Sequence, residues 1–339
     1  MTRYPRAARD VRRRLSASTG ASALALLVLA TAATPAAAAP TVKATVTDGT
    51  LRISGSPRAD KIVLRLSALD ANQLQVDVGD DGSADKTFDI ATLRAIDVEA
   101  GNGNDTVRID EVNGAFTTRL ATRIDGENGD DTLIGGSGNE IFVGGRGTDF
   151  VDGNGGADTA FLGKGDDTFV WDPGDGSDVI EGGSGSDTMV FNGSAGNEIM
   201  AATANGARVS FTRNLGNIVM DLDGVEVIGV RALGGTDAIT VNDVGGTDLE
   251  RVDVDLAATI GGSTADGQAD TVTVAATKGD DSIAADANGA AVEISGLSAF
   301  VQITHADPAS DKLIIDTVAG ADDVSLDPAL AALILVSVQ

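Results

Sequence analysis

Residues 126–170 read GENGDDTLI-GGSGNEIFV-GGRGTDFVD-GNGGADTAF-LGKGDDTFV, an unbroken series of nine-residue segments. After the insertion Trp171-Asp172 the series resumes at residues 173–190 as PGDGSDVIE-GGSGSDTMV. An upstream copy, AGNGNDTVR, occupies residues 100–108. In every copy the fourth residue is glycine, the sixth is acidic and the eighth is apolar. A fixed period of this kind is the signature of a stacked repeat architecture.

The acidic and glycine positions together predict a metal site. Glycines at the first, second and fourth positions are expected to adopt positive φ and to let backbone carbonyls converge. Carboxylate and carbonyl oxygens, without nitrogen or sulfur ligands, suit a hard cation, and Ca²⁺ is the abundant candidate outside cells. The predicted calcium ligands, which act through carboxylate or main-chain oxygens, are Asp105, Asp131, Glu140, Asp149, Asp158, Asp167, Asp178, Asp187, Gly135, Gly144, Gly147, Gly182 and Gly185.

The apolar eighth position predicts a very short strand after each turn, with its middle side chain facing inward. Each unit then buries about one apolar residue, so no unit is stable alone. The alternative is a flexible linker rich in Gly and Asp. A linker has no need for an apolar residue at every eighth position, or for Gly and Asp that keep phase, so the pattern favours a folded solenoid.

These repeats resemble the hemolysin-type, or RTX, calcium-binding repeat G-G-x-G-x-D-x-U-x, most fully in GGRGTDFVD (144–152) and GGSGSDTMV (182–190). The resemblance implies a parallel β-roll in which repeats i and i+2 stack and Ca²⁺ lies between stacked turns. Counting one ion for each gap between stacked turns in this family pattern gives on the order of five ions. One edge would carry Asp131, Asp149, Asp167 and Asp187, and the other Glu140, Asp158 and Asp178.

Some positions depart from the family pattern. Glu140 is one methylene longer than Asp, Glu127 replaces the second glycine, and Lys164 places a cation in a turn. RTX proteins usually leave the cell by a C-terminal export signal, whereas this chain begins with a segment typical of N-terminal export. The activities of secreted RTX toxins and proteases are therefore not transferred to it.

The flanks carry a weaker signature, an Asp followed by alternating aliphatic residues, which predicts β-strands. It starts at Asp60, Asp237, Asp270, Asp311 and Asp322. The predicted fold class is all-β, a parallel β-roll or β-helix solenoid of nonapeptide repeats flanked by further β-structure.

The predicted organisation follows from the same signals. It comprises an N-terminal β region (39–99), a calcium-binding β-roll (100–191) and a degenerate C-terminal solenoid (192–339). A separate β-sandwich is the alternative for the flanks. The apolar run at 333–338 reads as a last strand able to pair with a partner.

Composition excludes several classes of function. The chain has 339 residues, with 24 Lys and Arg against 51 Asp and Glu and a formal net charge of -27, so nucleic acid is a poor partner. It contains no Cys and a single His, which excludes disulfides, thiolate zinc sites, H-E-x-x-H metalloproteases and histidine-based triads in the repeats. No pair of carboxylates is singled out as catalytic, so no catalytic residue is predicted.

Residues 1–38 read as a secretory signal peptide. Basic residues precede an apolar run at 21–30, and the small residues at 36–38 suit cleavage. We therefore expect a secreted, extracellular mature chain without membrane insertion. A retained membrane anchor is the alternative, although the apolar run is short for a span.

The sequence thus predicts a secreted protein that binds several Ca²⁺ ions, without enzymatic activity, in which metal binding is coupled to folding. Two alternatives remain open. One is a cell-surface adhesin or matrix protein that uses a calcium-stiffened rod to meet a cell-envelope or polysaccharide partner. The other is a carbohydrate-active enzyme built on a β-helix.

Overall fold

The computed structural model describes residues 41–339, which fold almost entirely as β-strands. The predicted signal peptide (1–38) lies outside the described residues. Within the described part, no helix has the length and apolar character needed to cross a membrane.

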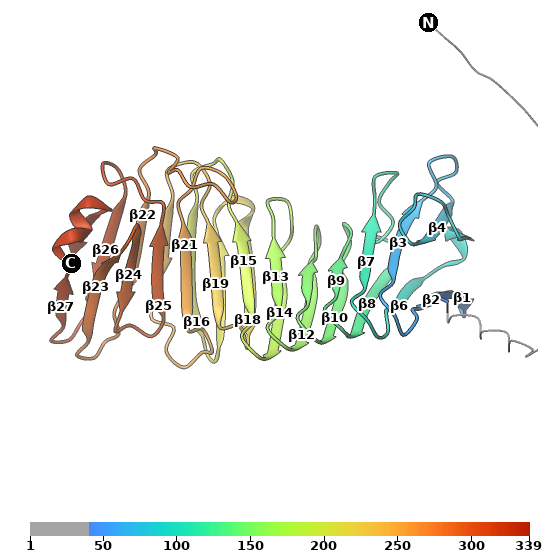
Figure 1. Ribbon diagram of the computed structural model, residues 1–339, viewed down its shortest axis with the longest axis horizontal. Coiled ribbons are helices and arrows are strands. Elements are labelled where there is room, and N and C mark those ends of the chain that lie inside the picture. Colours follow the sequence, from blue (N-terminus) through green and yellow to red (C-terminus); the bar gives the residue numbers. More distant parts are fainter. Residues whose placement is uncertain (1–40) are drawn as a thin grey trace, which may run out of the picture. The chain divides into compact units, whose positions relative to one another are not determined.

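The strands form two sheets with a solenoid topology (Figure 1). Neighbouring strands of the first sheet are, in order, β1 (Lys43–Thr47), β2 (Thr50–Ser54), β6 (Ala95–Glu99), β8 (Ala121–Asn128), β10 (Glu140–Arg146), β12 (Thr159–Lys164), β14 (Val179–Ser184), β18 (Ile218–Asp223), β17 (Arg208–Arg213), β16 (Ile199–Asn205), β20 (Ala238–Val241), β22 (Thr271–Ala275), β26 (Lys312–Asp316) and β28 (Leu335–Val338).

The second sheet contains the other strands. Their order is β27 (Asp323–Leu326), β23 (Ser282–Asn288), β24 (Ala291–Ser295), β25 (Phe300–Thr304), β21 (Arg251–Asp255), β19 (Val227–Arg231), β15 (Thr188–Asn192), β13 (Thr168–Trp171), β11 (Phe150–Asp152), β9 (Thr132–Ile134), β7 (Thr106–Asp110), β3 (Lys61–Leu66), β4 (Gln73–Val78) and β5 (Lys86–Asp89). Short 3₁₀ segments lie at η1 (Ile90–Thr92), η2 (Leu215–Asn217) and η3 (Pro328–Ala332).

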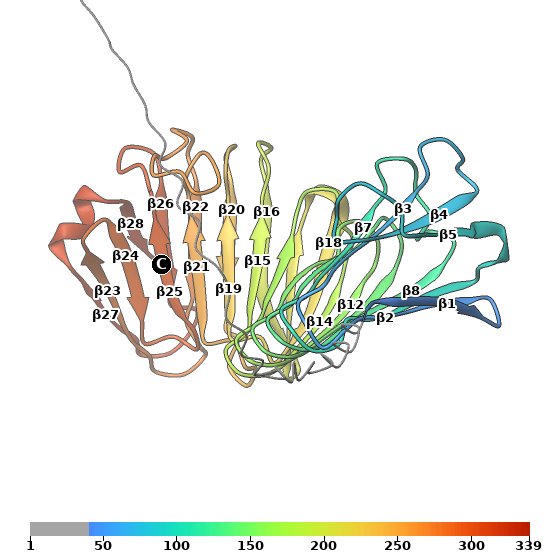
Figure 2. The same ribbon diagram turned by 45° about the vertical axis from the view of Figure 1, so that its right-hand side comes forward.

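In the repeats the chain visits the two sheets alternately, one strand per nonapeptide. Strand β10 pairs in parallel with β12, placing Ile141 opposite Thr159, and β11 pairs in parallel with β13. One coil is therefore two nonapeptides, and repeats i and i+2 stack. The sequence prediction of a parallel β-roll is confirmed, and Figure 2 shows the stacked strands from a second side.

The apolar eighth positions build the core between the sheets. Every one of them in the repeats is at most 1 % exposed: Val107, Leu133, Phe142, Val151, Ala160, Phe169, Ile180 and Met189. The insertion also serves this core, because buried Trp171 extends β13 and stacks on Phe191 of the next coil with ring centroids 4.0 Å apart. Each coil is thus held by few apolar side chains, as the sequence predicts.

The flanks continue the same two sheets and do not form a separate β-sandwich. They differ from the repeats by antiparallel excursions, in which β3–β4–β5, β16–β17–β18 and β23–β24–β25 are paired as meanders. Strand β18 pairs with β14 in the first sheet, and β16 pairs onward with β20. The hairpin strands therefore separate the repeat coils from the C-terminal coils within that sheet.

The glycine prediction holds only in part. Second- and fourth-position glycines such as Gly145 and Gly147 adopt positive φ, 111° and 130°. The first-position glycines Gly126, Gly135 and Gly144 do not. These positions require glycine for a steric reason, because an added Cβ would lie under 3.0 Å from carboxylate and carbonyl oxygens.

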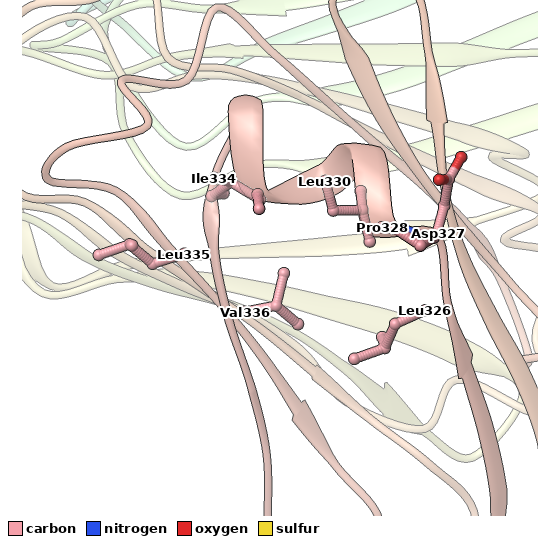
Figure 3. Close-up of a pocket in the computed structure, with 8 residues that line it drawn as sticks. Leu326, Asp327, Pro328, Leu330, Ile334, Leu335 and Val336 are labelled. Atoms are coloured by element: carbon pink, nitrogen blue, oxygen red, sulfur yellow. The ribbon is translucent and has the colours of Figure 1, made fainter.

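The last strands surround an apolar hollow. Side chains of η3 and of its flanking strands β27 and β28 line a cavity of about 310 Å³, with Leu330 and Ile334 buried and Leu335 at 49 % exposure (Figure 3). The apolar run at 333–338 includes strand β28. Among the described residues, β28 lies at the end of the first sheet and pairs there only with β26.

Candidate metal centre

The sixth-position carboxylates stack into rows along the two edges of the solenoid. The turns on one edge lead into strands of the second sheet, and we call this edge one. The turns on the other edge lead into strands of the first sheet, and we call this edge two. On edge one, the backbone N–H of Asp131 donates to Oδ1 of Asp149 at 2.8 Å, and that of Asp149 donates to Asp167 at 2.7 Å. The row extends from Asp105 at one end to Asp187 at the other.

Edge two carries a shorter row. The N–H of Glu140 donates to Oδ1 of Asp158 at 2.7 Å, and the N–H of Asp158 donates to Asp178 at 2.9 Å. The structure thus brings together all the acidic residues that the sequence singled out, in two rows rather than in one cluster. Each N–H fixes one oxygen of the next carboxylate, which orients the other oxygen into its own turn.

That other oxygen has no hydrogen-bond donor. These carboxylates are at most 2 % exposed, so water does not replace the missing partner. Among the repeat residues, the buried oxygens without a partner are Oδ2 of Asp105, Asp131, Asp149, Asp158, Asp167 and Asp187 and Oε1 of Glu140. A buried carboxylate oxygen left unpaired is costly unless a proton or a cation satisfies it.

Main-chain carbonyls face the same space. A Cβ added at Gly126 would lie under 3.0 Å from both Oδ2 of Asp131 and the carbonyl oxygen of Gly144, one coil further on. The same crowding recurs at Gly144, where Oδ2 of Asp149 meets the carbonyl oxygen of Leu162. Two hydrogen-bond acceptors therefore converge in each of these turns with no donor between them.

Burial also shifts the proton affinity of these groups. It raises the pKa of Asp131 from 3.8 to about 7 and that of Asp158 to about 9, with neighbouring carboxylates adding to the effect. The pKa of Asp149 and of Asp187 rises to about 6, again chiefly by burial. The rows therefore disfavour their own charge near neutral pH, as expected for groups that lack a cation.

The residues present fit a hard cation. Within residues 41–339 no three His, Asp or Glu side chains form a ready-made metal cluster, so main-chain oxygens must complete any donor set. One free carboxylate oxygen with carbonyls beside it, all of them oxygen donors in flexible turns, matches the preference of Ca²⁺. Zinc-type sites, which need nitrogen or sulfur ligands, do not fit.

Glu140 differs from the Asp positions. Its Oε2 accepts the N–H of Gly136 at 2.8 Å, and its longer side chain also approaches Gly138. The turn therefore satisfies part of this carboxylate with its own backbone. Its Oε1 has no partner, as Oδ2 has none at the Asp positions.

The structure adds row members that the sequence analysis named only as strand starts, or did not name at all. On edge one the row continues to Asp60 and Glu226, and on edge two a second row joins Glu198 to Asp237, Asp270 and Asp311. The signal was present at 193–201, where GSAGNEIMA repeats the pattern of GGSGNEIFV. An acidic sixth and an apolar eighth position suffice to find these turns when the glycines are lost.

Comparison with known proteins agrees with this geometry. The family model described as RTX calcium-binding nonapeptide repeat matches four copies, within residues 123–139, 134–169 and 174–197. No curated protein matches the sequence. The matched residues contain most of the turns with unpaired carboxylate oxygens, and the resemblance is confirmed: the chain carries hemolysin-type RTX calcium-binding repeats, folded as a β-roll.

Proposed function

We propose that this protein is a secreted calcium-binding β-roll, without enzymatic activity of its own, in which several Ca²⁺ ions order the repeat coils. The observation that carries the proposal is the repeated pairing of a buried, unpaired Oδ2 with a main-chain carbonyl, as at Asp131 and Gly144. A cation is the one partner that satisfies both acceptors without a proton.

The chain's own residues then perform three tasks. The N–H of each sixth-position residue orients the next carboxylate in the row, as between Asp149 and Asp167. Fourth-position glycines let turns approach until carbonyl oxygens line the gap, as Gly147 does over the carbonyl of Gly129. The first-position glycine leaves the volume beside Oδ2 open. Bound Ca²⁺ would supply the positive charge that neutralises neighbouring carboxylates.

Coupling to folding follows from the small core. Each nonapeptide buries one apolar eighth-position side chain, such as Val151 or Ala160, and must offset the ordering entropy of nine residues. Without a cation the neighbouring carboxylates within each row also repel one another. We infer that calcium binding contributes much of the folding free energy of residues 100–191.

The typical location of RTX repeat proteins supports the proposed calcium binding. RTX repeat proteins are typically extracellular, where modules of this kind bind Ca²⁺ at about 10⁻⁴–10⁻³ M. We propose that the chain stays loosely ordered before export and becomes rigid outside the cell. A cell-envelope or polysaccharide partner for the stiffened solenoid stays a prediction.

The test uses the full mature chain. Isothermal titration with Ca²⁺ should show several bound ions, and circular dichroism should show a gain of β-structure over the same concentration range. Asp149→Asn, which removes one carboxylate charge from the middle of edge one, should reduce the number of ions bound. Unchanged spectra together with no heat of binding would refute the proposal.

A further inference from the structure

A turn outside the matched repeats has the same construction as the RTX turns. At residues 232–237 the N–H of Thr236 donates to Oδ1 of Asn197 at 3.0 Å, just as Thr148 donates to Asp130 in the repeats. Gly235 stacks over the carbonyl of Gly196 as the fourth-position glycines do. The family match ends at residue 197, so it does not include this turn.

The backbone of this turn adopts the RTX conformation without the RTX glycine. Leu233 occupies the second position with φ of 70°, where the repeats place Gly145 at 111° or Gly163 at 114°. A leucine in this region is uncommon and costs free energy. The stacking of the coils therefore imposes the turn geometry even where the sequence does not favour it.

The carboxylate in this turn is buried and incompletely paired. Asp237 is 2 % exposed; its Oδ1 accepts the N–H of Glu198 at 2.7 Å, and its Oδ2 has no partner. The N–H of Asp237 in turn donates to Oδ1 of Asp270 at 2.8 Å. The free oxygen is therefore buried and unpaired like Oδ2 of Asp131 or Asp149, although the first position of this turn is Ala232 rather than glycine.

Further negative charge surrounds it. Asp266 lies over the turn, with its Oδ2 accepting the N–H of Gly235 at 3.1 Å. Burial, and then the charges of Asp270, Glu198 and Asp266, raise the pKa of Asp237 to about 7. Within residues 41–339 no ion pair involves Asp237, Asp266 or Asp270.

In the preceding turn, the chain neutralises a buried carboxylate with an arginine of its own. The guanidinium of Arg213, from β17, donates through Nε to Oε1 of Glu198 at 2.6 Å and through Nη2 to Ser194 Oγ at 3.1 Å. Both side chains of the pair are buried, at 7 % and 0 % exposure. Arg213 therefore neutralises Glu198, whereas no cationic side chain within residues 41–339 forms an ion pair with Asp237.

We propose that the turn at 232–237 is a separate site for a hard divalent cation, held by the unpaired Oδ2 of Asp237 in a turn made more negative by Asp266 and Asp270. The inference rests on the proposed function, since it extends calcium binding from the RTX repeats into the C-terminal coils. Strand β17, which carries Arg213, lies between this turn and the repeat turns of edge two.

The experiment counts Ca²⁺ ions on the full mature chain by native mass spectrometry. We expect Asp237→Asn to bind one ion fewer than the wild type, and Asp266→Asn to bind that ion several-fold more weakly. Asp286→Asn, at an exposed position of β23, is the matched control with the same charge change and should bind the wild-type number.

Thermal melting gives a second readout that does not depend on counting. In excess EDTA, Asp237→Asn should melt at a higher temperature than the wild type, because it removes a buried unpaired charge. In millimolar Ca²⁺ it should gain less stability than the wild type gains. A variant with a purely structural defect would melt lower in both conditions, and that result would overturn the proposal.

The outcomes separate this inference from the proposed function. If Asp149→Asn loses ions while Asp237→Asn and Asp266→Asn bind as the wild type does, this site does not exist and the RTX sites stand. If the wild type binds no Ca²⁺ at all, both proposals fail.

Discussion

The turn that ends in Asp149 and the turn that ends in Glu198 place a buried carboxylate in the same position of the same coil geometry. At Asp149, Oδ2 faces the carbonyl oxygen of Leu162 and has no donor. At Glu198, one oxygen accepts the guanidinium of Arg213 and the other accepts the N–H of Ser194. The first turn leaves one carboxylate oxygen for a proton or an external cation, whereas the second is neutralised by an arginine of the chain.

The packing of the hydrophobic core around the two turns also differs. Above the Glu198 turn, Arg213 lies 5.2 Å from the Trp171 ring, and Phe191 packs between Trp171 and Phe211. Most nonapeptides of the RTX coils bury one large apolar side chain, at the eighth position. We infer that hairpin strands and the Arg213–Glu198 pair make the C-terminal coils less dependent on metal ions than the RTX coils, so the two regions should respond differently to the same perturbation.

Calcium removal should produce the largest difference. At a free concentration of 100 Kd each ion contributes about 2.7 kcal/mol, and the RTX coils are proposed to bind several. Hydrogen exchange in EDTA should therefore accelerate strongly at β9–β15, and much less at β17, β19 and β21. Equal acceleration in both regions would remove the distinction between them.

The pH dependence of the metal-free chain should be the next largest effect. The folded pKa of Asp131, about 7, lies above its ordinary 3.8, so its contribution to stability is present below pH 3.8 and is lost as the pH rises through 7. A protonated Oδ2 can donate to the carbonyl that it faces. In EDTA the RTX coils should thus melt highest near pH 4 and lowest near pH 8.

Calcium should oppose that trend, because the ion binds the deprotonated form and releases protons. With saturating Ca²⁺ the melting temperature should no longer fall over the same interval. A fall of equal size with and without Ca²⁺ would show that these carboxylates do not hold the ion.

Arg213→Gln should destabilise the C-terminal coils by about 3–5 kcal/mol, since it leaves the charge of Glu198 buried and unpaired. Hydrogen exchange at β16 and β17 measures the loss. Arg52→Gln is the control: Arg52 pairs with Asp97 at 56 % side-chain exposure, where an ion pair contributes about 0–1 kcal/mol. Similar losses in the two variants would contradict the role assigned to Arg213.

Glycine substitutions should give the smallest of these effects, and they distinguish turn types. Gly147 has φ of 130°, and an added Cβ would meet the carbonyl of Gly129, so Gly147→Ala should cost roughly 2–3 kcal/mol and weaken calcium binding. Gly206, at φ of 72° with open space around it, should tolerate alanine at about 1 kcal/mol. Calorimetric melting with Ca²⁺ compares the two.

Much of the fold follows from local sequence. Gly147 and Asp149 mark a turn, and Val151 marks the inward-facing middle of a three-residue strand. Because a parallel solenoid repeats the same contacts in each coil, one correctly interpreted nonapeptide fixes its neighbours. The period therefore predicted stacked repeats with one buried apolar residue each, and the resemblance to RTX repeats added the β-roll, the two edges and the acidic rows.

The degenerate turns carry only part of that local signal, an acidic sixth and an apolar eighth position. Glu198, Asp237 and Asp270 follow turns that have lost one or more of the consensus glycines, and the hairpins between them break the nine-residue spacing. Their rows exist because strand pairing holds the turns in register. No local propensity encodes that alignment.

By itself the sequence determined the period, the direction of each side chain and the oxygen-rich chemistry of the turns, because these depend on residues within one nonapeptide. The tertiary structure alone decided which carboxylates are neutralised within the protein. Arg213 and Glu198 are 15 residues apart and on different strands, and they meet because β17 folds back antiparallel on β16. Charge compensation in this protein is therefore a property of stacked coils, since each carboxylate's partner belongs to another strand or to a bound ion.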